Sequence, residues 1–263
     1  MTFYTPKNEL LKKYLAGYYF ISGDEKLHYY TFPNNYFILS LNLDSHIELS
    51  QNRIVVKDSP EKNFLADYYA RYTAPIEILY QGGAQEITFY FLPSAIHHFV
   101  PDAERLLEKS YAPDFNPYPD FVDAMKGAFA LQNLEEKRDH LENYWLSKFK
   151  EQPQTQLQTL LRYLDSPLKL EAIAEEMGIS SQYLNKLFTR YIGKSPSEYR
   201  KIQRFRAAIQ RKAQHKNLTE LSHESLFYDQ SHLIKDFKQF TQEKPQTFFK
   251  KVDPQKENLW LFI

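Results

Sequence analysis

The chain has 263 residues, of which 43% are hydrophobic and 25% charged, with a formal net charge of zero and no cysteine. This length and composition favour a globular protein of two domains and exclude disulfides, thiolate nucleophiles and cysteine-ligated metals. The sequence has no apolar run of about 18 residues, and MTFYTPKNELLKKY lacks the apolar stretch of a signal peptide, so we expect a cytoplasmic protein without a membrane span.

The charges are unevenly distributed along the chain. Residues 1–150 carry 15 Lys and Arg against 20 Asp and Glu, whereas residues 178–251 carry 15 against 6. A basic C-terminal region beside an acidic N-terminal one suggests an anionic partner for the former. On charge alone, an ordinary solvated surface is an equally good explanation.

About the first 100 residues are predicted to form mainly strands. In NYFILSLNL, Phe37, Leu39 and Leu41 alternate with Ser40 and Asn42, and QEITFYFLP alternates in the same way. Period-2 alternation of β-branched and aromatic residues is typical of strands. The segments PNN, SGD and QGG supply turns between them.

The character of the sequence changes from about residue 118. PDFVDAMKGAFA and LEEKRDHLENYWLSKFK are rich in helix-forming residues. The polar segment KEQPQTQ is predicted to separate two domains, 1–150 and 151–263. The predicted fold class is therefore α+β, with an N-terminal, mainly antiparallel β domain followed by helices and a C-terminal domain that is all helical.

A helix-turn-helix unit is predicted at about residues 170–191. The apolar residues of LKLEAIAEEMG recur at helical spacing, and Gly178 can end that helix because glycine adopts a positive φ at low cost. Ser180 is placed to cap the next helix, which would bury Leu184 and Phe188. A single hairpin of this kind occurs in many helical domains, so it does not define a function by itself.

The following helix is predicted over residues 196–215. It opens with SPSE, in which Ser195 can cap the amide of Glu198 and Glu198 can bond back to the Ser195 amide, with Pro196 at the first helical position. At 1.5 Å per residue, this helix would span roughly 30 Å.

The pattern of the first unit then returns. Downstream of the turn an offset of 49 relates Lys186 to Lys235 and Phe188 to Phe237, while upstream the offset is 48, so the second turn is one residue longer. A second helix-turn-helix unit is thus predicted at about 218–241. A connector of roughly 30 Å suits successive major grooves on one face of B-DNA, which lie about 34 Å apart. Repeat and charge together predict DNA binding.

The repeated segment resembles the DNA-binding domain of AraC/XylS-family transcription regulators. LEAIAEEMGISSQYLNKLFTRYIGKSPSEYRKIQRFRAA is similar to its first half and LTELSHESLFYDQSHLIKDFKQFTQEKPQTFF to its second, covering about residues 155–251. The resemblance implies two helix-turn-helix subdomains bridged by a long helix. It also implies a bacterial transcription regulator, activator or repressor, that binds double-stranded promoter or operator DNA in adjacent major grooves.

The resemblance implies which side chains face DNA. Those facing the bases would be Gln182, Asn185 and Lys186 in the first unit and Gln230, Ser231 and Lys235 in the second. Gln and Asn can bond adenine, and Lys can donate to guanine or phosphate. Three further basic residues would touch phosphates or simply lie in solvent: Arg190, Lys194 and Arg200.

The second unit departs from the family pattern. Ser222 stands where Ala is usual, and Leu226 and Gln242 stand where Gly is usual. If position 226 adopts a left-handed conformation, Leu costs about 1–2 kcal/mol there, whereas the longer turn could also follow another path. The resemblance therefore supports base reading by the first unit more strongly than by the second.

The N-terminal domain is expected to sense a small-molecule effector, to form a homodimer, or both. QEITFYFLPSAIHHF weakly resembles the sensor domain of one AraC-type subgroup, and the aromatic strands could line a pocket or fill a core. The alternative is a DNA-binding regulator whose N-terminal domain is only structural or dimerising. Helices at 118–150 and the tail LWLFI, 259–263, are candidate dimer surfaces.

No enzymatic or metal site is predicted, and no cofactor. The adjacent His97 and His98 would point apart on a helix or strand, which is poor geometry for a shared metal ion. Neither a Gly-rich phosphate loop nor a nucleophile elbow occurs. An enzyme fused to a DNA-binding domain is therefore the less favoured interpretation.

Overall fold

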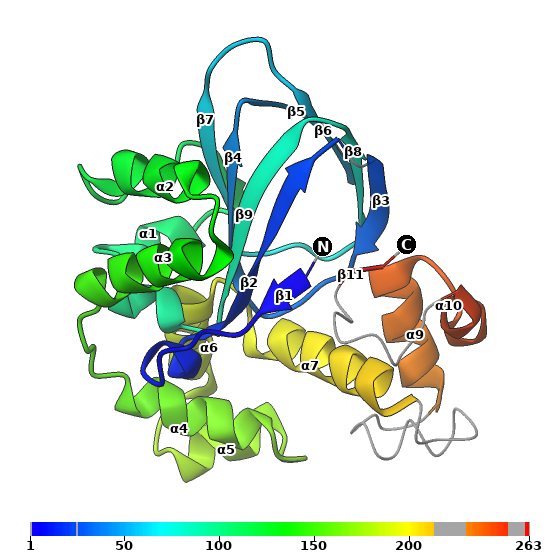
Figure 1. Cartoon of the computed structure of the whole chain (residues 1–263). Coiled ribbons are helices and arrows are strands. Elements are labelled where there is room, and N and C mark those ends of the chain that lie inside the picture. Colours follow the sequence, from blue (N-terminus) through cyan, green and yellow to red (C-terminus); the bar gives the residue numbers. More distant parts are fainter. Residues whose placement is uncertain (1, 25, 213–229, 252–260, 263) are drawn as a thin grey trace. The chain divides into compact units, whose positions relative to one another are not determined.

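The computed structural model describes residues 2–24, 26–212, 230–251 and 261–262, in two compact units (Figure 1). Unit 1 comprises Met1–Leu27, Tyr36–Ala70 and Leu79–Pro153; unit 2 comprises His28–Asn35, Arg71–Ile78 and Gln154–Ile263. Unit 1 combines strands with helices, and the described part of unit 2 is mainly helical, which confirms the α+β class. Two short segments of the N-terminal half thus belong to unit 2.

A six-stranded antiparallel sheet forms the framework of unit 1. Its strands, in spatial order, are β1 (Thr2–Tyr4), β2 (Leu15–Gly23), β9 (Ala84–Phe91), β4 (Phe37–Leu43), β7 (Phe64–Tyr69) and β10 (Tyr111–Ala112). On the central strand β4, Leu39 lies opposite Phe89 on one side and Tyr68 on the other.

The remaining strands are divided between the units. In unit 1, β5 (Ser45–Ser50) and β6 (Arg53–Asp58) form a hairpin closed by a two-residue turn. The boundary between the units falls within β3 (Lys26–Thr31) and within β8 (Ile76–Gln81). In unit 2, β3 pairs with β11 (Leu261–Phe262).

The predicted alternation along β4 and β9 is confirmed, and it gives the six-stranded sheet two different faces. One face carries fully buried Leu39, Leu41, Phe89 and Phe91. It packs against α2 (Phe121–Ala130) and α3 (Leu134–Lys148), which cover this face in Figure 1. Trp145 of α3 meets the rings of Phe89 and Phe91 edge to face, at centroid distances of 5.7 and 5.1 Å.

The opposite face of the sheet is buried but polar. The Glu86 carboxylate accepts hydrogen bonds from the hydroxyls of Tyr19, Tyr80 and Thr88, that of Tyr19 at 2.7 Å. Thr88 also donates to the Ser40 hydroxyl at 3.1 Å. A buried carboxylate is tolerated when hydrogen bonds replace its lost hydration, as here.

The connections of unit 1 are anchored by a second buried carboxylate. Glu142 of α3 accepts from the backbone N–H groups of Lys7 and Asn8, each at 2.9 Å, and from the Tyr18 hydroxyl at 2.6 Å. It thereby fixes the chain that enters β2. The short helices of this unit are η1 (Leu11–Lys13), η2 (Ala95–His98) and α1 (Ala103–Leu107).

Unit 2 is helical, as predicted for the C-terminal region. Its described helices are α4 (Thr155–Leu164), α5 (Leu170–Glu176), α6 (Ser181–Ile192), α7 (Pro196–Arg211), α9 (Gln230–Thr241) and α10 (Pro245–Lys251). They form two apolar cores, one among α4, α5 and α6 and one among α9 and α10. Helix α7 contributes Tyr199 to the first core and Ile202, Phe205 and Ile209 to the second.

The turn of the first helix-turn-helix is built as the sequence predicts. Gly178 has a φ of 64°, and the amide of Ile179 bonds the Ala174 carbonyl at 2.9 Å, which closes the end of α5. The Ser180 hydroxyl then accepts from the Tyr183 amide at 3.1 Å and caps α6.

The start of α7 differs from the predicted capping box. The Ser195 hydroxyl accepts from the Glu198 amide at 3.2 Å, as expected, but the Glu198 carboxylate binds the guanidinium of Arg71. The described helix ends at Arg211, and residues 213–215 of the predicted helix lie outside the described residues. The first helix and turn of the second unit, with Ser222 and Leu226, and most of the 259–263 tail lie outside the described residues.

Gln242 ends α9 in a left-handed conformation. Its φ is 60°, close to the 76° of Gly193 at the end of α6, and each amide bonds the carbonyl four residues earlier. The two units therefore share one terminating geometry, which glycine adopts without strain and glutamine does not.

Replacing Gln242 by Gly is expected to stabilise unit 2 by about 0.5–1 kcal/mol, because relief of left-handed strain exceeds the entropy that glycine adds to the unfolded chain. Gly193→Ala is the matched control and should destabilise by about 1 kcal/mol. Urea unfolding followed by circular dichroism measures both. A loss of stability in Gln242→Gly would contradict the strain argument.

A residue from the N-terminal half completes the second core of unit 2. Phe32 is buried and meets the Phe248 ring edge to face at 5.2 Å. Arg206 of α7 donates to the backbone carbonyls of Phe32 and Pro33, the latter at 2.8 Å, and the Tyr72 hydroxyl donates to the Phe32 carbonyl at 2.7 Å. Three groups thus hold this segment against the helices.

Phe32→Ala is expected to destabilise the α9–α10 region by about 3 kcal/mol, because it leaves a cavity in that core. Hydrogen exchange of the α9 and α10 amides is the measurement, since it isolates this region from unit 1. Leu49→Ala, at an exposed position of β5, is the control and should leave the exchange unchanged. Unchanged exchange in Phe32→Ala would show that the segment does not complete the core.

Candidate DNA-binding surface

The exposed side of α6 presents the polar residues that the sequence assigned to bases. Leu184 and Phe188 point into the core, and Gln182, Asn185 and Lys186 are all exposed. The Asn185 amide donates to the Ser181 carbonyl one turn earlier at 2.9 Å. The helix therefore presents the side-chain amides of Gln182 and Asn185 and the ammonium of Lys186 on its solvent-exposed side.

Helix α9 repeats this arrangement. Leu233 and Phe237 are fully buried, in the places of Leu184 and Phe188, and Lys235 is exposed in the place of Lys186. The remaining two assigned residues lie at the start of the helix: Ser231 is exposed and Gln230 is half-buried. Both helices thus combine an anchored apolar side with a polar exposed one.

The three basic residues assigned to phosphates do not form one surface. Arg190 is exposed near the end of α6, with its guanidinium 5.8 Å from the Tyr191 ring. Arg200 is half-buried and donates to the Leu168 carbonyl at 2.7 Å. Lys194 is only 1% exposed. In this conformation Lys194 does not reach a surface where a phosphate could bind, because the groups around it exclude solvent.

Lys194 lies beside a paired acid and base. Arg71 Nε and Nη2 bind the two Glu198 oxygens at 2.8 and 2.7 Å, a bidentate arrangement. Burial lowers the pKa of Lys194 to about 8; the carboxylate of Glu198 acts in the opposite direction and the charge of Arg71 in the same one. Sequence reasoning missed this cluster because Arg71 is remote in the chain.

The stability of unit 2 should rise with pH relative to a Lys194→Met variant. The native pKa of Lys194 lies below that of the unfolded chain, so the unfolded chain binds more protons between about pH 8 and 10.5. We expect the wild type to gain about 2 kcal/mol over the variant between pH 7.5 and 9.5. Urea unfolding of both proteins at each pH is the test, and parallel pH profiles would rule out a depressed pKa.

Tyr183 is an exposed aromatic residue that the sequence analysis did not assign. It is 45% exposed in the first turn of α6, next to Gln182, and its hydroxyl lies 3.5 Å from the Gln156 side chain. Its position one residue before the buried Leu184 could have signalled an exposed face, since neighbouring residues on a helix point about 100° apart.

The described residues show neither a cluster of metal ligands nor a membrane-spanning helix. Within the described ranges, no three His, Asp or Glu side chains are grouped to hold a metal ion. Of the described helices, none combines the length and apolar character needed to cross a membrane. His98, one of the adjacent histidines, accepts from the Gln152 amide at 3.2 Å and stacks on Phe149.

Comparison with known proteins adds a family match over the helices just described. Residues 173–251 match the model of a helix-turn-helix domain. No curated protein sequence matches the chain. Among solved structures, ToxT from Vibrio cholerae in a P21 crystal form is 11% identical with a TM-score of 0.43, covering 89% of this chain and 96% of that one. ToxT from strain SCE256 with a bound unsaturated fatty acid is 12% identical with a TM-score of 0.44, covering 91% and 96%.

The matched domain and the repeated exposed helix faces define a DNA-binding transcription regulator. The matched domain is of the AraC type and lies within the segment whose sequence resembles AraC/XylS-family regulators.

Proposed function

We propose that the protein reads an operator with two recognition helices, α6 and α9, set in adjacent major grooves of one DNA duplex. The observation that carries this proposal is the repeated helix surface: Lys186 and Lys235 occupy equivalent exposed positions on helices whose apolar sides are buried in equivalent ways. The base-facing set is the one assigned from sequence: Gln182, Asn185, Lys186, Gln230, Ser231 and Lys235.

The chemistry of these side chains suits base edges in the major groove. The amides of Gln182 and Asn185 can each bond adenine through a donor and an acceptor, and Lys186 can donate to guanine. Tyr183 adds an apolar ring that can meet a thymine methyl group, with a hydroxyl for a phosphate. Of the three phosphate candidates, Arg190 is the one whose exposed position supports the role, whereas Lys194 would first have to leave its buried site.

The connector supports simultaneous binding of both helices. The 16 residues of α7 span about 24 Å. Helix α6 packs on Tyr199 in the first turn of α7 through Phe188, whereas α9 packs further along through the Phe205–Phe237 ring pair. The two recognition helices thus pack at different points along one continuous helix, whose length is of the same order as the roughly 34 Å between successive grooves. The excess of basic residues between 178 and 251 adds attraction to the phosphates.

Control of DNA binding by a small molecule in unit 1 is the second part of the proposal. Its support is that His28–Asn35 and Arg71–Ile78 continue directly from unit 1 strands and pack against α7 within unit 2. A ligand that shifts β3 or β8 would act on these segments. The competing possibility is an N-terminal region that only dimerises or supports the fold. Homodimerisation through α2 and α3, and a cytoplasmic location, stay predictions.

Gln182→Ala and Lys186→Ala are each expected to weaken operator binding by about 1–3 kcal/mol while leaving the fold intact, because each removes a contact to a base edge. The operator would come from genomic footprinting with the native protein, and the affinity from fluorescence anisotropy at fixed salt. Lys126→Ala, at an exposed position of α2 in unit 1, is the matched control for loss of one positive charge.

Lys235→Ala tests the second unit in the same assay. If the loss of operator affinity is confined to one half-site, the result supports two recognition helices that bind separate half-sites. If both α6 variants bind the footprinted operator like the wild type, with unchanged circular dichroism, the assignment of α6 as a recognition helix is wrong.

A further inference from the structure

One polar side of α7 contacts the surroundings of both recognition helices. Residues three and four apart lie on the same side of a helix, and Arg200, Gln203 and Arg204 have this spacing. The Arg200 guanidinium donates to the Leu168 carbonyl at 2.7 Å, and the Gln203 amide donates to the Asp165 carboxylate. Both partners belong to the connection between α4 and α5, which leads into the first unit. Arg204 instead contacts α9 of the second unit.

The partner of Arg204 is a buried carboxylate on the second recognition helix. Asp236 is only 3% exposed, and its Oδ2 lies 3.4 Å from Nη2 of Arg204. Burial raises the pKa of this carboxyl group, whereas positive charge on Arg204, Lys201 and His232 lowers it. A carboxylate without an opposite charge would be costly at this place, so the ionised form of Asp236 depends on the guanidinium.

The first recognition helix carries an apolar residue in place of Asp236. The offset of 49 residues that relates the two units pairs Asp236 with Leu187 of α6, which is half-buried. The two neighbouring positions of the repeat keep their character, since Lys186 matches Lys235 and Phe188 matches Phe237. The two recognition helices therefore share their exposed cation and their buried ring, and they differ in the residue between them.

The ion pair adds a directional contact to the packing of α9. The apolar side of this helix meets α7 through Phe237 and Phe240, whose rings lie 5.0 and 5.2 Å from that of Phe205. Apolar burial is not directional, whereas a hydrogen-bonded ion pair requires a defined distance and angle. Adjacent residues of a helix point about 100° apart. A rotation of α9 that breaks the contact of Asp236 therefore also moves the exposed ammonium of Lys235.

We propose that Arg204 and Asp236 are positioning residues for DNA recognition: their contact fixes the rotation of α9 about its own axis and thereby the direction in which Lys235 meets the second half-site. This inference rests on the proposed function, because it concerns how α9 reads the operator. A buried ion pair adds little net stability, since both groups must first lose their hydration, and fixing a register is its best-attested role.

The double variant Arg204→Leu, Asp236→Leu tests this role in the full chain. It gives α9 the residue that α6 has at the equivalent position. Replacing a buried ion pair by apolar residues is often neutral or stabilising, so we expect urea unfolding to show a stability equal to or above that of the wild type. Affinity for the footprinted operator, measured by fluorescence anisotropy, should nevertheless fall about tenfold.

Operators with one scrambled half-site show where the loss arises. The half-site of α9 is the one at which Lys235→Ala loses affinity. With that half-site scrambled, the double variant and the wild type should bind equally, whereas scrambling the other half-site should preserve the tenfold difference. A purely structural role would lower the affinity for both half-sites alike. Glu48→Ala, Lys57→Ala, which removes an ion pair of the β5–β6 hairpin, is the matched control and should bind like the wild type.

Two results would overturn the inference: operator affinity of the folded double variant equal to that of the wild type, or a loss shared by both half-sites. If the double variant does not fold, Asp236→Asn takes its place, because it keeps the shape of the side chain and removes its charge. It should lose about threefold in affinity at the α9 half-site alone, and unchanged affinity would equally overturn the inference. Failure of the proposed function is distinguishable, since the wild type itself would then protect no operator.

Discussion

The apolar side of α7 is the constraint on which the DNA-binding unit depends. This one helix supplies Tyr199 to the core beneath α6 and Phe205 to the core beneath α9. Both recognition helices bury part of their apolar side against it, and α6 also packs on α4 and α5. This matters because a short amphipathic helix gains most of its stability from packing rather than from its own backbone. The spacing and orientation of the two exposed surfaces are therefore set by a continuous backbone, which is stiffer than any loop connection.

The helical half was largely predictable because its signals are local. Gly178 and Ser180 define their turn through interactions within a few residues, and the repeat placed Lys235 by analogy with Lys186. The departures arise from residues distant in sequence. The Glu198 carboxylate binds the Arg71 guanidinium and not the Ser195 amide, and Lys194 is buried beside the Arg71–Glu198 pair. Neither outcome can be deduced from the spacing of residues in SPSE.

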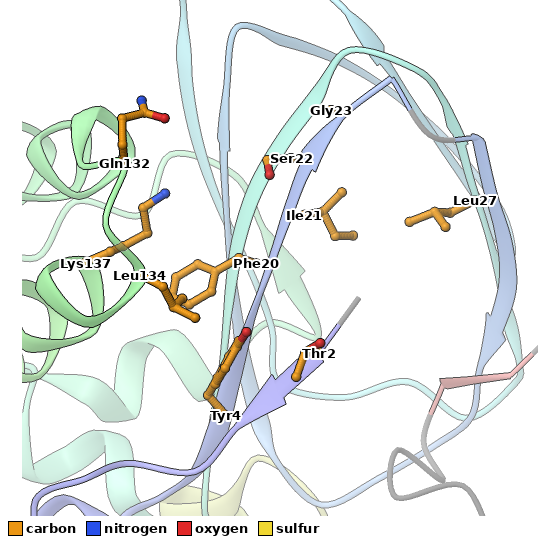
Figure 2. Close-up of a pocket in the computed structure, with 10 residues that line it drawn as sticks. All are labelled: Thr2, Tyr4, Phe20, Ile21, Ser22, Gly23, Leu27, Gln132, Leu134 and Lys137. Atoms are coloured by element: carbon orange, nitrogen blue, oxygen red, sulfur yellow. The ribbon is translucent and has the colours of Figure 1, made fainter.

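Unit 1 shows the same division between local and distant information. Alternation along β4 and β9 predicted which side chains share a face, and Leu39 and Phe89 are indeed buried together. The alternation did not reveal that the second face, around the carboxylate of Glu86, is also buried. A period of two tells which residues share a face of the sheet, but it does not tell whether other parts of the chain cover that face. The strand pattern also did not predict the pocket that Thr2, Phe20 and Lys137 line (Figure 2), because this pocket brings together the first strands and a helix more than a hundred residues later.

The position of Phe32 has a consequence for how this regulator can be divided. A fragment cut at the linker near residue 153 would contain every helix of the DNA-binding unit and still lack a ring from its second core, together with the carbonyl groups that Arg206 binds. Such a fragment would expose apolar surface around Phe248 and remove two carbonyl acceptors of the Arg206 guanidinium. The DNA-binding helices therefore cannot be transferred alone to another sensor domain. The new domain would have to supply an aromatic ring and carbonyl groups equivalent to those of the Phe32 segment.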